Sequence, residues 1–170
     1  MTSLALKFAS RRPHEAVECH GATTVVFAIP PGDPDYRVEA TYTFPRGAML
    51  LALGPHMHLR GKEFRFAAEY PDGTTETLLH VPNYDFDWQA SYVLDVPKRF
   101  PKGTRLRATG TFDNSPDNPD NPDPDKLVYF GLQSNEEMMI GYFDVVWDQE
   151  EEAKSEAESE TEVRSPSSDL

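Results

Sequence analysis

The chain has 170 residues, of which 38% are hydrophobic, and a formal net charge of −13. This length suits one domain with a tail, and the negative charge argues against nucleic acid or an anionic membrane surface as a partner. No run approaches the ~20 apolar residues of a membrane-spanning helix, and the first ten residues lack the basic start and long apolar stretch of an export signal. The single cysteine, Cys19, excludes an intrachain disulfide and any multi-cysteine metal site.

The composition divides the chain into three parts. Residues 1–22 are expected to form a lead-in, residues 23–147 a β domain, and residues 148–170 an acidic tail. The tail holds nine acids and two bases and therefore carries −7 of the total charge. Because it has no aromatic residue and little to bury, we expect it to be disordered.

Within the β domain, β-branched and aromatic runs alternate with turn sequences. The apolar run 48–53 and the turn Pro71-Asp72-Gly73, which predicts a hairpin, belong to this pattern. No stretch has a helical period over more than about two turns. The other expected strands cover residues 23–29, 36–44, 63–70, 74–80, 88–94, 104–112, 127–132 and 138–147. Strands at this spacing predict an all-β fold, an antiparallel, jelly-roll-like β-sandwich.

Residues 113–125, DNSPDNPDNPDPD, are rich in proline and in side-chain oxygens. Proline removes backbone donors and Asn and Asp favour turns, so no regular element is expected here. The oxygens would suit calcium, but the order of acids, central glycine and closing glutamate of an EF-hand is missing. A surface loop is the favoured interpretation.

His56 and His58 form a His-x-His pair where the apolar run 48–53 ends. On an extended backbone, residues two apart point to the same side, so both imidazoles could reach one metal ion. A third ligand is not fixed by spacing. Met138 and Met139 are candidates, since a thioether favours copper, particularly Cu(I). Adjacent methionines can equally be core residues.

One alternative is a cupin-type site, because His56, His58 and Glu63 match the internal spacing of the first cupin motif. Pro101-Lys102-Gly103 also matches part of the second motif. The third histidine of that motif is absent, since Leu106 stands in its place, and Leu50 replaces the leading glycine of the first motif. The cupin metal site is therefore incomplete.

A second resemblance covers residues 5–146. The segments that carry it are PHMHLRGK (55–62), YPDGTTETLL (70–79), NYDFDWQ (83–89), PKGT (101–104), FDNSPDNPDNPDP (112–124) and EEMMIGYFD (136–144). In this order they resemble the C-terminal domain of the copper type II, ascorbate-dependent monooxygenases. That family includes peptidylglycine α-hydroxylating monooxygenase, dopamine β-monooxygenase and bacterial relatives, which are the most similar.

The resemblance implies one copper ion held by His56, His58 and Met138, with Met139 as the alternative sulfur ligand. It implies no catalytic residue beyond these ligands. The activity would be hydroxylation of a C–H bond in a small-molecule or peptide-like substrate, with O2 and a reductant such as ascorbate. A non-catalytic copper-binding or interaction module is the alternative.

Family enzymes also carry a second copper in an N-terminal domain. Nothing before Thr23 matches that domain, so a partner domain or protein would have to supply the second copper. The relatives are mostly exported, which suggests a periplasmic or secreted protein, although this chain offers no signal for export.

Two aromatic residues of the segment 83–89, Tyr84 and Trp88, are expected to be core or pocket-wall residues first and substrate contacts second. Arg60 and Lys62 follow the histidines closely and could meet an anionic group. Solvated positions at a strand end are the favoured interpretation for both.

Overall fold

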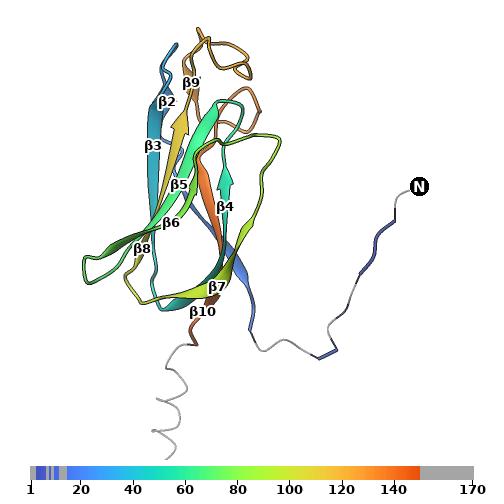
Figure 1. Cartoon of the computed structure of the whole chain (residues 1–170), viewed down its shortest axis with the longest axis vertical. Helices are drawn as coiled ribbons and strands as arrows, with labels where there is room; N and C mark the ends of the chain where they lie inside the picture. The colour runs from blue at the N-terminus through green and yellow to red at the C-terminus, as the bar shows by residue number, and fades with distance from the viewer. Residues whose placement is uncertain (1–2, 7, 9, 12–14, 150–170) are drawn as a thin grey trace, which may run out of the picture.

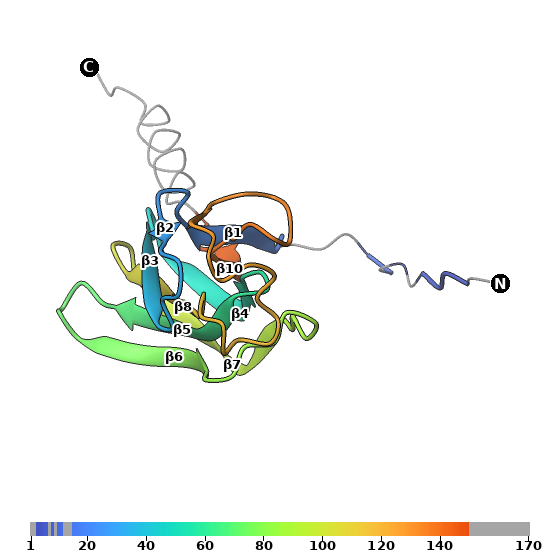
Figure 2. The same cartoon turned by 90° about the horizontal axis from the view of Figure 1, so that it is seen from above.

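Two four-stranded antiparallel sheets pack face to face in the computed structural model, which describes residues 3–6, 8, 10–11 and 15–149 (Figures 1 and 2). The first sheet has the order β1-β10-β4-β7, and the second has the order β3-β8-β5-β6. A short pair, β2-β9, lies at one end. The strands are β1 (Glu18–Thr23), β2 (Ala28–Ile29), β3 (Tyr36–Thr43), β4 (Ala48–His56), β5 (Gly61–Glu69), β6 (Thr75–Val81), β7 (Tyr92–Phe100), β8 (Arg105–Phe112), β9 (Val128–Tyr129) and β10 (Ile140–Trp147). The predicted all-β, antiparallel sandwich is therefore confirmed.

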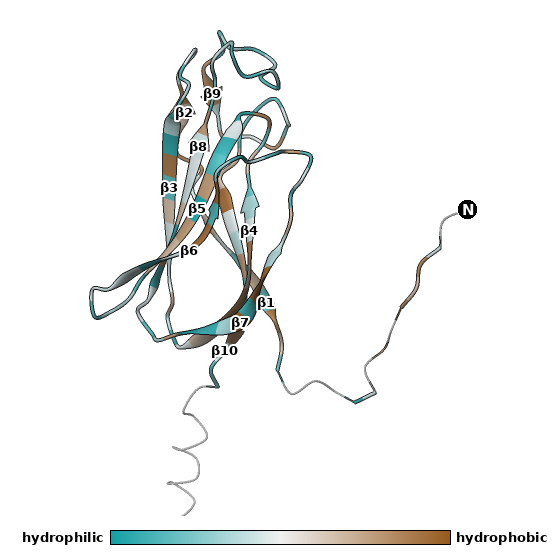
Figure 3. Ribbon diagram, in the orientation of Figure 1, coloured by the Kyte–Doolittle hydropathy of each residue, from teal (hydrophilic) through white to brown (hydrophobic). Residues whose placement is uncertain are grey.

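The described residues contain no helix, and so none that could cross a membrane. The strands instead alternate between hydrophilic and hydrophobic residues along their length, as the colours of Figure 3 show. In β5, for example, Phe64 and Phe66 point into the sandwich whereas Arg65 is exposed. This period of two is what a strand needs to cover a core on one face and meet water on the other. The largest core side chains are Phe44, Phe64, Phe66, Phe100, Phe112 and Phe143, each at most 1% exposed.

The first strand lies earlier than the sequence predicts. β1 starts at Glu18, inside the segment 1–22 that was expected to be a lead-in, and it pairs with β10 along its whole length. The expected strand 23–29 is interrupted, and only Ala28 and Ile29 form β2. The reason is local, because the Thr24 side-chain oxygen accepts a hydrogen bond from the Val26 amide (3.2 Å) and turns the chain.

The seventh strand lies later than predicted. Residues 88–91 belong to a loop in which the Trp88 amide donates to the Asp85 carbonyl (3.1 Å), and β7 begins only at Tyr92. β7 contains Pro97, which removes one ladder donor. This is tolerated because β7 is an edge strand of the first sheet. The predicted acidic tail lies outside the described residues, apart from Asp148 and Gln149.

The candidate site lies where β4 and β10 meet. These strands are antiparallel neighbours, with His56, the last residue of β4, opposite Ile140, the first residue of β10. In Figure 1 the arrowhead of β4 points to the end of the sandwich that carries β2 and β9. The histidines and the methionine pair of the sequence are therefore brought together by strand pairing.

Candidate metal site and groove

The two histidines lie at the end of β4, where His56 is half-buried and His58 is buried. Met57, between them, is completely buried in the core. The His56 and His58 rings are 5.3 Å apart between centroids and stand nearly perpendicular, at 83°. The two imidazoles are therefore neighbours.

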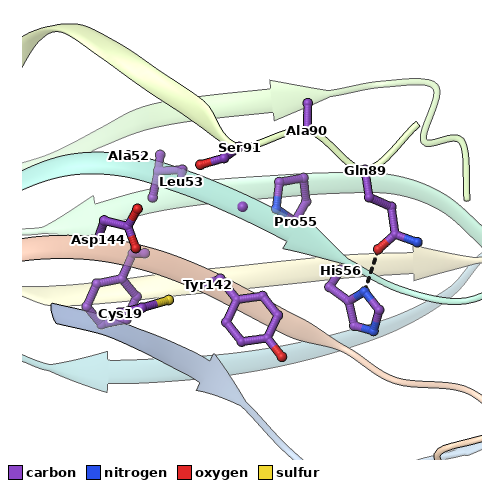
Figure 4. A pocket seen from close by; sticks show the side chains of 12 residues that line it. Cys19, Ala52, Leu53, Pro55, His56, Gln89, Ala90, Ser91, Tyr142 and Asp144 are labelled. Carbon is purple, nitrogen blue, oxygen red and sulfur yellow. Dashed lines mark hydrogen bonds between the residues drawn. The ribbon is translucent and has the colours of Figure 1, made fainter. Parts of the chain in front are cut away.

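A hydrogen bond fixes which ring nitrogen of His56 is free. Its Nδ1 lies 2.5 Å from Oε1 of Gln89 (Figure 4), and the Gln89 amide nitrogen donates to the Phe86 carbonyl (2.8 Å). Since the amide nitrogen is occupied by a carbonyl, the atom that faces His56 is an acceptor, and Nδ1 must carry the proton. In the neutral ring, Nε2 then bears the lone pair.

His58 is arranged in the same way. Its Nδ1 lies 3.1 Å from the Glu136 carbonyl oxygen, which can only accept, so Nδ1–H is the donor and Nε2 of the neutral ring bears the lone pair. The ring is 5% exposed, and this burial lowers its pKa, which favours the neutral form. A hydrogen bond from the remote nitrogen to a carbonyl or amide oxygen is typical of histidines that bind metals.

Burial separates the two candidate methionines. Residues 137, 139, 141, 143 and 145 are buried, whereas the residues between them are half-buried or exposed. Met139 belongs to the core, where its side chain and that of Met57 both lie against Gly110 of the opposite sheet. By this alternation, half-buried Met138 lies on the outer side together with Tyr142, whose ring is 6.1 Å from that of His56. Met139 is therefore a core residue, and Met138 is the more accessible of the two methionines.

A buried carboxylate holds the backbone of the histidine segment. Glu137 is inaccessible, and its two oxygens accept hydrogen bonds from the amides of His58 (2.8 Å) and Arg60 (2.7 Å). Burial raises its pKa to about 7, although these hydrogen bonds and the Arg60 charge act against the rise. Glu137 thus fixes the path of the chain on either side of His58.

Arg60 corrects one expectation. It was expected to be solvated, but it is completely buried. Its Nε donates to Oδ1 of Asn114 (2.8 Å) and its Nη1 to the Asn135 carbonyl (3.1 Å). Lys62, by contrast, is exposed and bonds to the Pro34 carbonyl and to Asp35. Arg60 is therefore a structural cation, and its guanidinium is not exposed to a ligand beside the histidines.

The proline-rich loop 113–125 is pinned at its start. Asn114 is also fully buried, and its side-chain amide donates to the carbonyls of Pro30 (2.8 Å) and Lys126 (2.9 Å). Together with Arg60, it ties the loop to the histidine segment. The loop is otherwise mostly exposed, as its composition predicts.

Tyr84 and Trp88 differ in their surroundings. The Tyr84 hydroxyl donates to the Met57 carbonyl (2.8 Å) and accepts from the Met57 amide (3.0 Å), and desolvation raises its pKa to about 12. It therefore braces the residue between the two histidines. Trp88 is 75% exposed and is not a core residue. Neither residue lines the groove that adjoins His56.

The candidate ligands would suit copper by the chemistry of their donors. Two imidazoles and one thioether would form a soft donor set of the kind that favours Cu(I). Among the described residues, no three side chains of His, Cys, Asp and Glu gather as a metal site. Glu63, the third residue of the cupin-type pattern, bonds to His80 (2.9 Å) on the outer side of the second sheet. It therefore lies on the opposite face of the sandwich from the histidine pair.

A groove of about 330 Å³ runs along β4 and β10 from His56 (Figure 4). Gly54, Ala52 and Tyr142 lie along it, and Cys19 and Asp144 lie at its far end. The loop residues Gln89, Ala90 and Ser91 line its other side. Sequence reasoning missed Gln89 as a partner of His56, because 33 residues separate them and no spacing rule joins a loop glutamine to a strand end.

Comparisons with known proteins give no family. No protein-family model matches the chain, and no curated protein matches it. Among solved structures, the chain is similar to the infectious bursal disease virus VP2 subviral particle, with a TM-score of 0.38 and 12% identity over 85% of this chain and 37% of that chain. For the infectious bursal disease virus Gt strain the TM-score is 0.37, with 9% identity over 85% of this chain and 36% of that chain. The chain thus spans less than two thirds of both viral chains, and at this level of similarity nothing follows about its site.

Proposed function

We propose that this chain is the copper-binding, oxygen-activating half of a copper-dependent monooxygenase, with His56, His58 and Met138 as the metal ligands. The observation that carries the proposal is the matched hydrogen bonding of the two histidines. Nδ1 of each ring lies beside an oxygen acceptor, an arrangement in which Nε2 would bear the lone pair, and the ring centroids are 5.3 Å apart. The resemblance in the segments around these residues supports copper as the ion.

Copper bound there would supply one-electron and oxygen chemistry. The chain's own residues perform the positioning. Gln89 and the Glu136 carbonyl orient the two rings, and Glu137 holds the backbone on either side of His58. The groove that starts at His56 offers a place for a substrate beside the ligands. A partner that carries a second copper would deliver electrons from a reductant such as ascorbate.

The test is a titration of the metal-free protein with Cu(I), followed by X-ray absorption at the copper edge to detect a sulfur ligand. We expect one ion per chain, and we expect His56→Ala or His58→Ala to abolish tight binding. Met138→Leu should remove the sulfur signal and keep the histidine signal, because leucine has a similar volume and no sulfur.

Two matched variants serve as controls. Met139→Leu changes a core methionine, and His80→Ala removes an exposed histidine of the second sheet, so both should leave copper binding unchanged. If Met139→Leu, and not Met138→Leu, removed the sulfur signal, the assigned ligand would be wrong. If neither histidine variant changed the affinity, the proposed site would be wrong. Copper binding without ascorbate-dependent oxygen uptake, even with a partner domain added, would favour a non-catalytic module.

A further inference from the structure

The groove beside His56 has an uneven distribution of charge. Asp144 is the only carboxylate among its lining residues, and no lysine or arginine lines it. Small or apolar side chains make up most of the remaining wall, including Ala52, Leu53 and Ala90. A ligand in this groove therefore meets an apolar surface along most of its length and a negative charge at the end far from His56.

The Asp144 carboxylate is not compensated by a neighbouring cation. It takes part in none of the ion pairs of the described residues. Its cross-strand neighbour is Cys19, and burial together with the Asp144 carboxylate raises the pKa of that thiol. A half-buried carboxylate beside an apolar wall interacts more favourably with a cation than with any neutral group.

The register of the strands gives the length of the groove. Asp144 lies opposite Ala52, and His56 is four residues further along β4. At the rise of an extended strand, these positions are about 13 Å apart. Gly54 lies between them opposite Tyr142 and keeps the groove open, because it adds no side chain to the outer face.

We propose that Asp144 is the specificity-determining residue of this groove, which takes a ligand with an apolar body and a cationic amine at the end remote from His56. Anionic ligands are rejected, because they would meet the Asp144 carboxylate without any basic residue to offset it. This inference rests on the proposed function in one respect only, namely that the end of the groove at His56 adjoins the proposed copper site. Binding in the groove itself needs no metal.

The test uses three probes that share one apolar chain, namely octylamine, octanol and octanoate. Their binding to the full, metal-free chain is measured by titration calorimetry. We expect octylamine to bind about tenfold or more tightly than octanol, and octanoate to bind more weakly than either. Asp144→Asn should abolish the preference for the amine over the alcohol.

Two further variants separate specific binding from general attraction to an acidic protein. Asp95→Asn removes an exposed carboxylate of β7 outside the groove and should keep the amine preference. Gly54→Leu should block all three probes, and a Cβ at this position would have one close neighbour, Tyr142 Cβ at 3.4 Å. Thermal unfolding checks the fold of each variant.

Equal binding of octanoate and octylamine would overturn the proposal. So would an amine preference that survives Asp144→Asn, or binding that survives Gly54→Leu. Copper titration distinguishes failure of this inference from failure of the proposed function. If copper binds but the amine is not preferred, the proposed specificity of the groove is wrong and the metal site stands. If the amine is preferred but copper does not bind, the proposed metal site is wrong and the specificity of the groove stands.

Discussion

The two sides of the chain at the end of β4 are built differently. On the inner side, Glu137, Arg60 and Asn114 are completely buried, and their polar atoms bond to one another's backbone or side chains. On the outer side, His56 is half-buried beside a groove, and its Nδ1 is held by a glutamine on an exposed loop. The inner side fixes the backbone, whereas the outer side orients the His56 ring beside the groove. Variants on the inner side should therefore change stability, and variants on the outer side should change binding.

The largest effect is expected for Glu137→Ala. It removes the acceptor of two buried backbone amides, each of which would be left without a partner, so it should lower the free energy of unfolding by about 3–5 kcal/mol. Urea denaturation measures this. Glu136→Ala is the matched control, since it removes a less buried neighbouring carboxylate and should cost less than about 1 kcal/mol. Equal costs for the two variants would contradict the role given to Glu137.

Glu137 should also make stability depend on pH. Its folded pKa of about 7 lies above the ordinary value of 4.5, so the folded state binds its proton more tightly than the unfolded state does. This contribution is complete below pH 4.5 and is lost as the pH rises to about 7, by about 3 kcal/mol. Denaturation across that range should show the loss in the wild type and not in Glu137→Gln. A parallel pH dependence of both proteins would contradict the prediction.

Tyr84→Phe should have the next largest effect. It keeps the ring but removes the hydroxyl that bonds to both the amide and the carbonyl of Met57, at an expected cost of about 1–3 kcal/mol. Trp88→Ala, four residues away, changes a side chain that is 75% exposed, and should stay within about 0.5 kcal/mol of the wild type. Thermal unfolding compares the two. A larger loss for Trp88→Ala would show that this loop is packed in solution.

The smallest effect on stability is expected for Gln89→Ala, within about 0.5 kcal/mol, because the side chain is exposed. Its effect on Cu(I) affinity should be a loss of about 10–100-fold, since His56 loses the acceptor that fixes its tautomer. Gln89→Glu keeps an oxygen acceptor and should retain most of the affinity. Unchanged copper affinity in Gln89→Ala would show that copper binding by His56 does not depend on the hydrogen bond to Gln89.

Local sequence patterns predicted most of the strands. The alternation in 63–70 and the turn at 71–73 correspond to β5 and the β5–β6 hairpin. The run 138–147 largely corresponds to β10, and 104–112 to β8. The pattern failed at β1, whose residues 18–21, ECHG, have little intrinsic strand preference. β1 forms because all of its residues pair with β10. This pairing joins distant parts of the chain, so no local pattern predicts it.

The class of the fold was predictable from the sequence alone, because it follows from the period of two along the strands. The pairing of His56 with His58 was predictable as well, because only one residue separates them. Spacing alone did not separate Met138 from Met139, although the family resemblance favoured Met138. Their different burial depends on tertiary packing, because Met139 belongs to the core between the two sheets and Met138 is half-buried. The same holds for Arg60, Glu137 and Gln89. Each acts through a partner 33 to 77 residues away, and burial and hydrogen bonding across that separation arise only when the two sheets close.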